Sequence, residues 1–419
     1  MAEQYVYLTE DMALVRGVKY GLVIDFASGA LHRLNEPACK ILEDSGQAIS
    51  LEKSLEGLGL PLEGAEAFLQ EMQAKKLITM TTAPQEVPQA SESPPPAQLD
   101  FIWMEVTSSC NLRCLHCYAE ASAQQTAQPT TRELLDWLDQ AAAMGCRHLQ
   151  LTGGECTLRD DLPELLAHAR SSYETIEIFT NATLLNESLI RFLAANQIQV
   201  AFSFYSYRPD VHDLIAGVPG SQHKTLEGLK LLLAHDVKVR GAIIGLKQNE
   251  PGLEATEYFL QELGVAAGPA DPVRPCGRGR HQDFWPVKYG QCKVRSKPAF
   301  RVGRRQYLSN QHWNSCWFGK AAISPQGDVL PCVFARDQVA GNLYEHPLAW
   351  ICQNGLLSYW ELSRDKVNGC RDCEFRYLCE DCRPWAYGYT GDLLAKSPTC
   401  TYDPYTGEWG PPESALERL

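Results

Sequence analysis

The sequence lacks any run of eighteen consecutive apolar residues, so no segment is long enough to form a membrane-spanning helix. We also expect no signal peptide, because Glu3, Glu10 and Asp11 occupy positions where such a peptide is basic and then apolar. Basic residues are few, with 38 Lys and Arg against 51 Asp and Glu and a net charge of −13. Phosphate binding needs a net basic face. We therefore expect a cytoplasmic protein that binds neither a membrane nor nucleic acid.

Cysteine is the residue type in excess. The chain has 16 cysteines among 419 residues, several of them in Cys-x-x-Cys spacings. Disulfide scaffolds are typical of short secreted chains without an adequate core, whereas this length and a 45% hydrophobic content predict two to four well-packed domains. The cysteines therefore indicate ligation of a metal or an iron-sulfur cluster.

The first 80 residues predict a small module of strands followed by helices. Strands are expected at 20–24 and 30–34 around a Ser28-Gly29 turn, and helices at 36–42, after the N-cap Asn35, and from Pro61 onward. This order suits a winged helix, but acidic residues outnumber basic ones in its helical part, which argues against DNA binding. Residues 81–99 contain five prolines and predict an extended tether that permits a range of relative positions.

Beyond the tether, strand-like and helical segments alternate. Repeated strand-helix units imply parallel strands with right-handed crossovers, and about six units precede residue 269, too few for a complete eight-unit barrel. The expected fold class is α/β, a partial six-unit barrel between an N-terminal winged-helix-like domain and a C-terminal Cys-rich domain. The expected domains are 1–82, a linker at 83–99, the barrel at 100–300 and the Cys-rich domain at 301–419.

A loop with three cysteines, Cys110, Cys114 and Cys117, follows the first barrel strand. Three thiolates at this spacing can surround one small object and leave a metal position open for substrate chemistry, whereas structural zinc and electron-transfer clusters take four protein ligands. A zinc site would require His116 as the fourth ligand. The spacing and its place after the first strand resemble the radical S-adenosylmethionine (SAM) enzymes.

That resemblance implies a [4Fe-4S] cluster on this loop, with SAM chelated to its open iron and cleaved to a 5′-deoxyadenosyl radical. It also implies a SAM-binding role for residues at the ends of successive strands. Gly153, Gly154 and Glu155 would hold the SAM amino group, and Ser203 its ribose or carboxylate. Tyr118 would meet the adenine with its backbone. Asn181 lies in a Thr-Asn-Ala sequence where the family has Thr-Asn-Gly.

Seven further cysteines at the C-terminus resemble the SPASM extension, an auxiliary-cluster domain of radical SAM enzymes that modify peptides. Cys370 to Cys382 alone could be a zinc ribbon. The resemblance implies one auxiliary [4Fe-4S] cluster on Cys370, Cys373, Cys379 and Cys400, and another on Cys316, Cys332 and Cys382. The fourth ligand of the latter could be Cys292, which we prefer, or Cys276, or a substrate thiolate at an open iron. Arginines such as Arg278 and Arg280 nearby could steer an acidic peptide or form a solvated face.

In this context, the N-terminal module resembles the PqqD-like recognition element that binds the leader of a ribosomal precursor peptide. We therefore expect a radical SAM peptide maturase that takes electrons from a reductant such as flavodoxin or ferredoxin. The expected product is a cross-link, a thioether of the sactipeptide or ranthipeptide kind, with a carbon-carbon or carbon-oxygen bond as alternative. An iron-sulfur redox protein without SAM cleavage is the alternative from another class.

Overall fold

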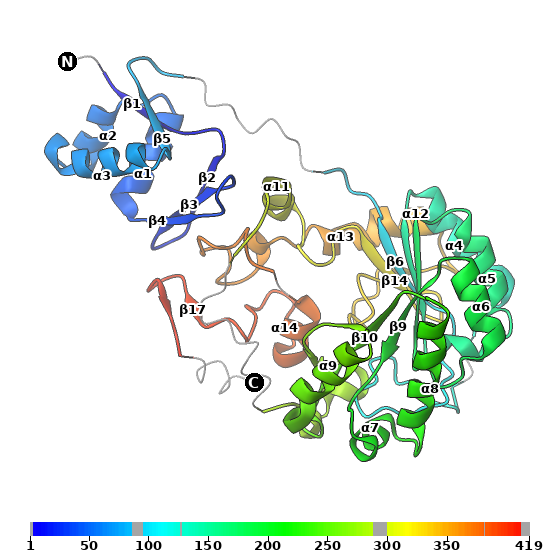
Figure 1. Ribbon diagram of the computed structural model, residues 1–419. Coiled ribbons are helices and arrows are strands. Elements are labelled where there is room, and N and C mark those ends of the chain that lie inside the picture. Colours follow the sequence, from blue (N-terminus) through cyan, green and yellow to red (C-terminus); the bar gives the residue numbers. More distant parts are fainter. Residues whose placement is uncertain (1–2, 86–94, 126–127, 288–299, 381, 412–419) are drawn as a thin grey trace.

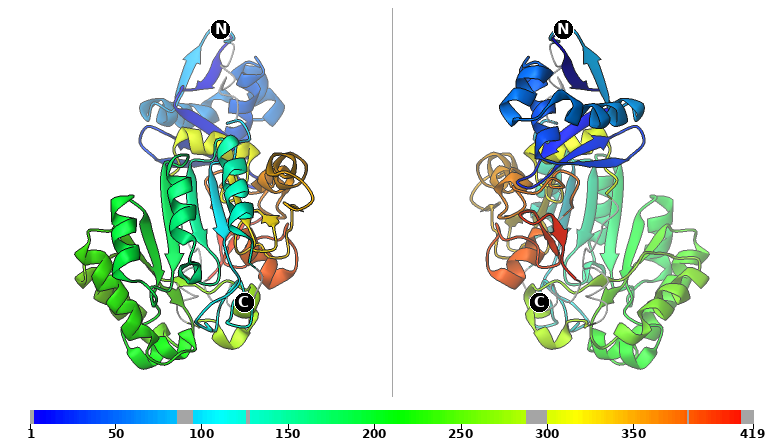
Figure 2. Two further views of the ribbon diagram at one scale, coloured as in Figure 1. Left: turned by 90° about the vertical axis from the view of Figure 1, so that its right-hand side faces the viewer. Right: turned by 90° about the vertical axis from the view of Figure 1, so that its left-hand side faces the viewer.

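The structure is a computed structural model that describes residues 3–85, 95–125, 128–287, 300–380 and 382–411. A small N-terminal module, a large α/β part and a loop-rich C-terminal part follow one another along the chain (Figure 1). The orange-to-red C-terminal segments lie between the blue module and the green strands in Figure 1 and along one side of the molecule in Figure 2.

The central element is a nine-stranded sheet with the order β12-β10-β9-β8-β7-β6-β14-β15-β16. Its first six strands are all parallel to one another, as the alternating pattern predicted. They are β6 (Phe101–Glu105), β7 (His148–Thr152), β8 (Thr175–Thr180), β9 (Gln199–Ser203), β10 (Val239–Ala242) and β12 (Ala266–Ala267). β11 (Ile244–Gly245) follows β10 and β13 (Asp271–Pro272) follows β12 in the sequence, and these two short strands pair in parallel as a separate sheet.

The last three strands of this sheet come from the C-terminal part: β14 (Lys320–Ile323), β15 (Asp328–Leu330) and β16 (Gly341–Asn342). β14 pairs in parallel with β6, whereas β15 and β16 add antiparallel. These strands are not predictable from hydrophobic periodicity, because they are only two to four residues long and show no alternating pattern. The Cys-rich part therefore shares the sheet of the barrel.

Helices cover one face of the sheet (Figure 1). One of them, α4 (Thr131–Ala143), shows why: Leu134, Trp137, Leu138 and Ala141 recur at helical spacing and are buried against the strands. The other helices of this part are α5 (Leu162–Arg170), α6 (Glu187–Ala195), α7 (Pro209–Ala216), α8 (Ser221–Ala234) and α9 (Leu253–Glu262).

The N-terminal module contains two small sheets and three helices. β1 (Tyr5–Leu8) pairs with β5 (Ile78–Thr81), while β2 (Met12–Arg16), β3 (Gly21–Asp25) and β4 (Leu31–Leu34) form an antiparallel sheet. Gly29 adopts a φ of 75° in the predicted turn, and Asn35 caps the first helix through its side chain. The helices are α1 (Glu36–Gly46), α2 (Leu51–Leu58) and α3 (Leu62–Ala74).

This module is docked on the C-terminal part, whereas the proline-rich tether suggested a range of relative positions. Val15, Leu22 and Ile24 of its three-stranded sheet form one apolar cluster with Tyr307 and Leu308. Residues 86–94 of the tether lie outside the described residues. The apolar contact places the module at one position relative to the rest of the chain.

The C-terminal part is rich in loops, as predicted. Its helices are α11 (Arg304–His312), α12 (Leu348–Ile351), α13 (Leu357–Trp360) and α14 (Arg383–Thr390), and its last strands are β17 (Tyr402–Asp403) and β18 (Glu408–Trp409). Within the described residues of the whole chain, no helix has the length and apolar character that crossing a membrane requires.

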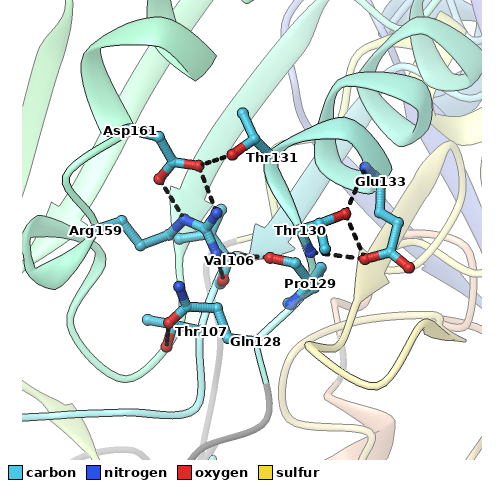
Figure 3. Close-up of polar contacts among 9 residues, drawn as sticks. All are labelled: Val106, Thr107, Gln128, Pro129, Thr130, Thr131, Glu133, Arg159 and Asp161. Atoms are coloured by element: carbon cyan, nitrogen blue, oxygen red, sulfur yellow. Dashed lines mark hydrogen bonds and ion pairs between the residues drawn. The ribbon is translucent and has the colours of Figure 1, made fainter.

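A buried arginine ties the strand that precedes the cysteine loop to the helix that follows it (Figure 3). Arg159 donates to the carbonyl oxygens of Val106 at 3.1 Å and Pro129 at 2.9 Å. Its other nitrogens donate to both carboxylate oxygens of Asp161, which also accepts from Thr131 on α4. Both ends of the loop, at 106 and 129, are thereby held by one guanidinium.

We predict that Arg159→Met lowers the free energy of unfolding by about 3 kcal/mol, because it leaves Asp161 without its cation and two carbonyls without donors. Urea unfolding of the apoprotein measures this. Arg191→Met, which removes an exposed partner of Glu187 on α6, serves as the control and should change stability by less than about 0.5 kcal/mol. Equal effects of the two substitutions would contradict the prediction.

Candidate active site

The three cysteines of the loop line one hollow of about 90 Å³ at the carboxyl ends of the parallel strands. Gly153, Gly154, Asn181, Ser203 and Tyr118 line the same hollow. The residues predicted separately at the ends of β6, β7, β8 and β9 are thus brought together. Burial raises the pKa of the thiols of Cys110 and Cys114 to about 12. Because thiolates are the ligands of metals, ligation here would release protons.

Two glycines allow the loop after β7 to approach the cysteine loop closely. A Cβ atom on Gly154 would lie 2.0 Å from the carbonyl oxygen of Ser109, and one on Gly153 2.5 Å from that of Thr107. Gly153 also has a φ of 138°, which side chains rarely allow. The amide of Gly154 donates to Thr107 at 2.7 Å. Only glycine fits at these two positions.

Glu155 is fully buried and does not line the hollow. Its Oε1 accepts hydrogen bonds from the amide and hydroxyl of Thr157 and from the hydroxyl of Thr180, and its Oε2 accepts from the amide of Asn181 at 2.7 Å. This carboxylate therefore joins the ends of β7 and β8. The contact of Glu155 with a SAM amino group stays a prediction. Its Oε2 atom could accept one more hydrogen bond, as such a contact requires.

The end of β8 is also held in place. The side chain of Asn181 donates to Asn111 of the cysteine loop at 2.8 Å. Ala182, which stands where the family has glycine, adopts a φ of 59° and is buried. A non-glycine residue in this left-handed conformation stores strain of about 1 kcal/mol.

Two residues near the loop were not recognised from the sequence as parts of the site. Tyr205, two residues after β9, donates its hydroxyl to the sulfur of Cys114 at 3.3 Å. Arg278 donates to the carbonyl oxygens of Cys114 at 2.8 Å and Ala121 at 3.1 Å. Arg278 therefore braces the loop instead of forming a solvated face, while Arg280 makes an exposed ion pair with Asp337. The roles of Tyr205 and Arg278 have no sequence signature, because both depend on contacts between segments that are distant in the sequence.

His116 lies between two of the loop cysteines but faces elsewhere. Its ring packs edge-on against Tyr205, with 4.9 Å between centroids, and it lines the barrel cavity but not the cysteine hollow. Burial lowers the pKa of His116 to about 4. This placement does not support the zinc alternative, which required His116 as the fourth ligand.

A larger cavity of about 500 Å³ adjoins the hollow inside the barrel. Tyr118, Thr152, Phe179 and Ser203 line both. Its walls are mainly apolar, with Trp103 on β6 and Phe334 of the C-terminal part among them. An ion pair between Arg240 and Glu177, 2.6 Å at its shortest, also faces this space. The cavity is the natural place for a substrate next to the hollow.

The C-terminal cysteines form two groups. Cys316 and Cys382 line a hollow of about 460 Å³. Burial raises the pKa of Cys332, and the nearby Cys382 and Cys316 add to that rise. Cys276 lies in the wall of the barrel cavity. Cys292, the preferred fourth ligand, lies outside the described residues. The second group lines one small hollow and consists of Cys370, Cys373, Cys379 and Cys400.

Arg274 separates the barrel cavity from the hollow of the first group and lines both. Burial raises the pKa of Cys382, and the positive charge of Arg274 opposes that rise. The guanidinium of Arg274 lies 4.9 Å from the ring centroid of Phe334. Its Nε is buried and has no hydrogen-bond partner among the described residues. The positive charge of Arg274 thus lies between the barrel cavity and the thiols of the first cysteine group.

Comparison with known protein families agrees with this arrangement. Residues 104–259 match the Radical SAM superfamily. Residues 316–374 match the SPASM iron-sulfur cluster-binding domain. The chain is therefore a radical SAM enzyme with a SPASM domain, and [4Fe-4S] clusters and SAM are its cofactors. The three-thiol hollow and the close glycine backbone fit such a cluster with SAM at its open iron.

Two relatives are similar over most of the chain. An AdoMet-dependent heme synthase of Methanosarcina barkeri is 28% identical over 73% of this chain and 97% of its own length. The antilisterial bacteriocin subtilosin biosynthesis protein AlbA of Bacillus subtilis is 26% identical over 70% of this chain and 68% of its own.

Among solved structures, Streptococcus suis SuiB bound to S-adenosylmethionine has a similar fold, with a TM-score of 0.55 at 15% identity. The similarity covers 94% of this chain and 99% of SuiB. Another structure shows SuiB bound to its precursor peptide SuiA.

We predict that changing Cys110, Cys114 and Cys117 together to Ala removes one of about three clusters and all SAM cleavage. Iron and sulfide content after anaerobic reconstitution, and 5′-deoxyadenosine release, measure the two effects. Cys146→Ala changes a buried core thiol that lines none of the four hollows described above; it is the control and should retain both. Stoichiometric zinc without iron in the parent protein would contradict the prediction.

Proposed function

We propose that this enzyme is a peptide maturase that cross-links a ribosomal precursor peptide whose leader binds to residues 1–82. The observation that carries this proposal is the N-terminal module docked against the SPASM part. A catalyst for a small substrate has no evident need for such a module. A fused module can hold a long substrate at one site while another segment of it reacts elsewhere.

The comparisons support a peptide substrate. The similarity to SuiB spans 94% of this chain, so it includes the N-terminal module, and SuiB binds a precursor peptide. AlbA takes part in the biosynthesis of a bacteriocin. The heme synthase matches over nearly its full length but leaves about a quarter of this chain without a counterpart.

The module offers a free strand edge for the leader. β4 pairs with β3 on one side and is the last strand of its sheet among the described residues. An extended peptide could add to this edge through main-chain hydrogen bonds and place apolar side chains against α3. This is the PqqD-like mode of recognition that the sequence suggested.

We assign the cofactors to the residues predicted from the sequence. Cys110, Cys114 and Cys117 hold the SAM cluster, with Tyr118, Gly153, Gly154, Glu155, Asn181 and Ser203 around SAM. Cys316, Cys332 and Cys382 hold one auxiliary cluster, and Cys370, Cys373, Cys379 and Cys400 the other. Cys292 remains the proposed fourth ligand of the former, and a flavodoxin or ferredoxin the proposed reductant.

The expected product is a thioether. When bound, SAM would supply hydrogen-atom abstraction and an auxiliary cluster would supply an acceptor for one electron. Forming a C–S bond from a C–H and an S–H bond removes one hydrogen atom, one proton and one electron. The hydrogen atom leaves with the abstraction, the proton leaves from the thiol, and the electron goes to the cluster. The protein's residues would confine the reacting segment: Trp103, Phe179 and Phe334 line the cavity next to the three-cysteine hollow, where their apolar rings would limit the access of water. A carbon-carbon or carbon-oxygen cross-link would use the same cavity.

A tetrapyrrole is the second candidate substrate, because the heme synthase is similar over 97% of its length. Arg240 and Arg274 face the barrel cavity and could hold carboxylates of such a substrate. This candidate does not explain the N-terminal module.

The test of function uses peptides encoded by short reading frames next to the gene, and iron-coproporphyrin as the competing substrate. We predict a peptide product lighter by two hydrogen atoms per cross-link, with a cysteine no longer open to alkylation. The same peptide without its leader should react at least about tenfold more slowly, since it loses binding energy of more than about 1.4 kcal/mol. Conversion of the porphyrin but of no peptide would overturn the proposal.

A second prediction concerns Arg274. A nearby cation stabilises the reduced, more negative state of a cluster, so Arg274→Gln should disfavour reduction of the first auxiliary cluster about tenfold, or about 59 mV. Redox titration followed by electron paramagnetic resonance measures this. Arg280→Gln, an exposed arginine in the same segment, is the control and should leave the potential unchanged. An unchanged potential in both variants would show that Arg274 does not act on the cluster.

A further inference from the structure

One side chain of the N-terminal module reaches into the C-terminal part. Arg33 on β4 donates from Nε to Oε1 of Glu374 at 3.2 Å and from Nη2 to the carbonyl oxygen of Gly407 at 2.6 Å. Its Nη2 also donates to the hydroxyl of Tyr402, which in turn donates to Glu374. The guanidinium lies 4.0 Å from the ring centroid of Tyr20. Arg33 is thus held by both parts of the chain.

The partners of Arg33 lie beside two of the cysteines assigned to the second auxiliary cluster. Glu374 directly follows Cys373, and Tyr402 is two residues after Cys400. Tyr402 itself lines the hollow that these cysteines share. The cysteines are far apart in sequence, and Arg33 bridges the two segments that carry them.

The burial of these partners makes the contact hard to replace. Glu374 is 0% exposed and Tyr402 is 1% exposed. The Oε2 atom of Glu374 has no hydrogen-bond partner among the described residues. Without Arg33, a buried carboxylate would keep only one hydroxyl donor, so the segment would have to shift to reach water or another cation.

The backbone of the module also contacts the segment that carries Cys373 and Glu374. The amide of Val18 donates to the carbonyl of Asp372 at 2.8 Å, and Arg376 donates to the carbonyl of Arg16 at 2.6 Å. A Cβ atom on Gly17 would lie 2.8 Å from the amide nitrogen of Glu374, so only glycine allows this approach. The turn between β2 and β3 thus packs directly on residues 372–376.

We propose that the N-terminal module has a second role, as a structural part of the second auxiliary cluster site, with Arg33 as the positioning residue. This inference rests on the proposed assignment of Cys373 and Cys400 as cluster ligands. Arg33 aligns the two ligand-bearing segments by satisfying Glu374, Tyr402 and Gly407 at once. A protein in which the module only bound a leader would not need a cation of the module beside the buried carboxylate of Glu374.

The test uses full-length protein with Cys110, Cys114 and Cys117 changed to Ala, so that only auxiliary clusters contribute. In this background, Arg33→Gln should lose one cluster's iron and sulfide and the corresponding resonance signal, while the other cluster remains. Arg33→Lys restores the charge beside Glu374 and should recover part of the signal. Arg304→Gln is the matched control: it lies in the same interface, donates to the carbonyl of Glu10 and touches neither ligand segment.

A milder variant guards against general unfolding. Tyr402→Phe removes only the hydroxyl between Arg33 and Glu374, and it should speed iron loss from the second cluster to a chelator at least tenfold. Unchanged iron content in Arg33→Gln, or unchanged chelation in Tyr402→Phe, would overturn the proposal. Cys373→Ser and Cys400→Ser should remove the same signal; if they do not, the ligand assignment is wrong, which separates that failure from failure of the role of Arg33.

Discussion

The site depends on the close contact between the backbone of residues 107–109 and that of Gly153 and Gly154. No side chain fits between these segments, so the loops after β6 and β7 are fixed against each other by main-chain hydrogen bonds. Glu155 extends the connection to β8 through Thr180 and Asn181. Three strand ends thereby act as one support, and the cysteines, the glycines and Ser203 keep their places around a common hollow. A preorganised support of this kind lets the protein hold a reactive group without rearrangement.

The predictable parts of the fold were those encoded locally. Alternating strand and helix patterns predicted six parallel strands, and the spacing of Cys110, Cys114 and Cys117 predicted one shared hollow, because sequence neighbours on a short loop remain neighbours in space. The unpredicted parts depend on distant contacts. Tyr205 and Arg278 reach Cys114 only after the chain has folded. β14 pairs with β6 although all the other strands and helices of the barrel lie between them in the sequence. Hydrophobic periodicity carries no information about such pairings.

The ligand question at the C-terminus shows the same limit. Spacing groups Cys370, Cys373 and Cys379 because they share one loop, and the structure places Cys400 with them. Spacing says nothing about Cys276, which lies in the wall of the barrel cavity because the chain after β13 turns back over the cysteine loop. There Gly277 packs against the carbonyl of Tyr118 at a distance that excludes a side chain. The path of the chain, more than the cysteine spacing, therefore decides which thiols share a hollow, as in the Cys370 group, and which line the barrel cavity, as Cys276 does.

The tether and the interface together explain how recognition and chemistry can be connected. A proline-rich tether alone would raise the local concentration of a bound peptide without specifying its direction. The docked module adds a direction, because β4 presents its free edge while the same strand carries Arg33 into the SPASM part. A leader paired along β4 would lie beside a strand that is anchored next to Cys373 and Cys400. The distance from leader to cavity would then be set by packed structure and not by the tether, which favours modification at a defined distance from the leader.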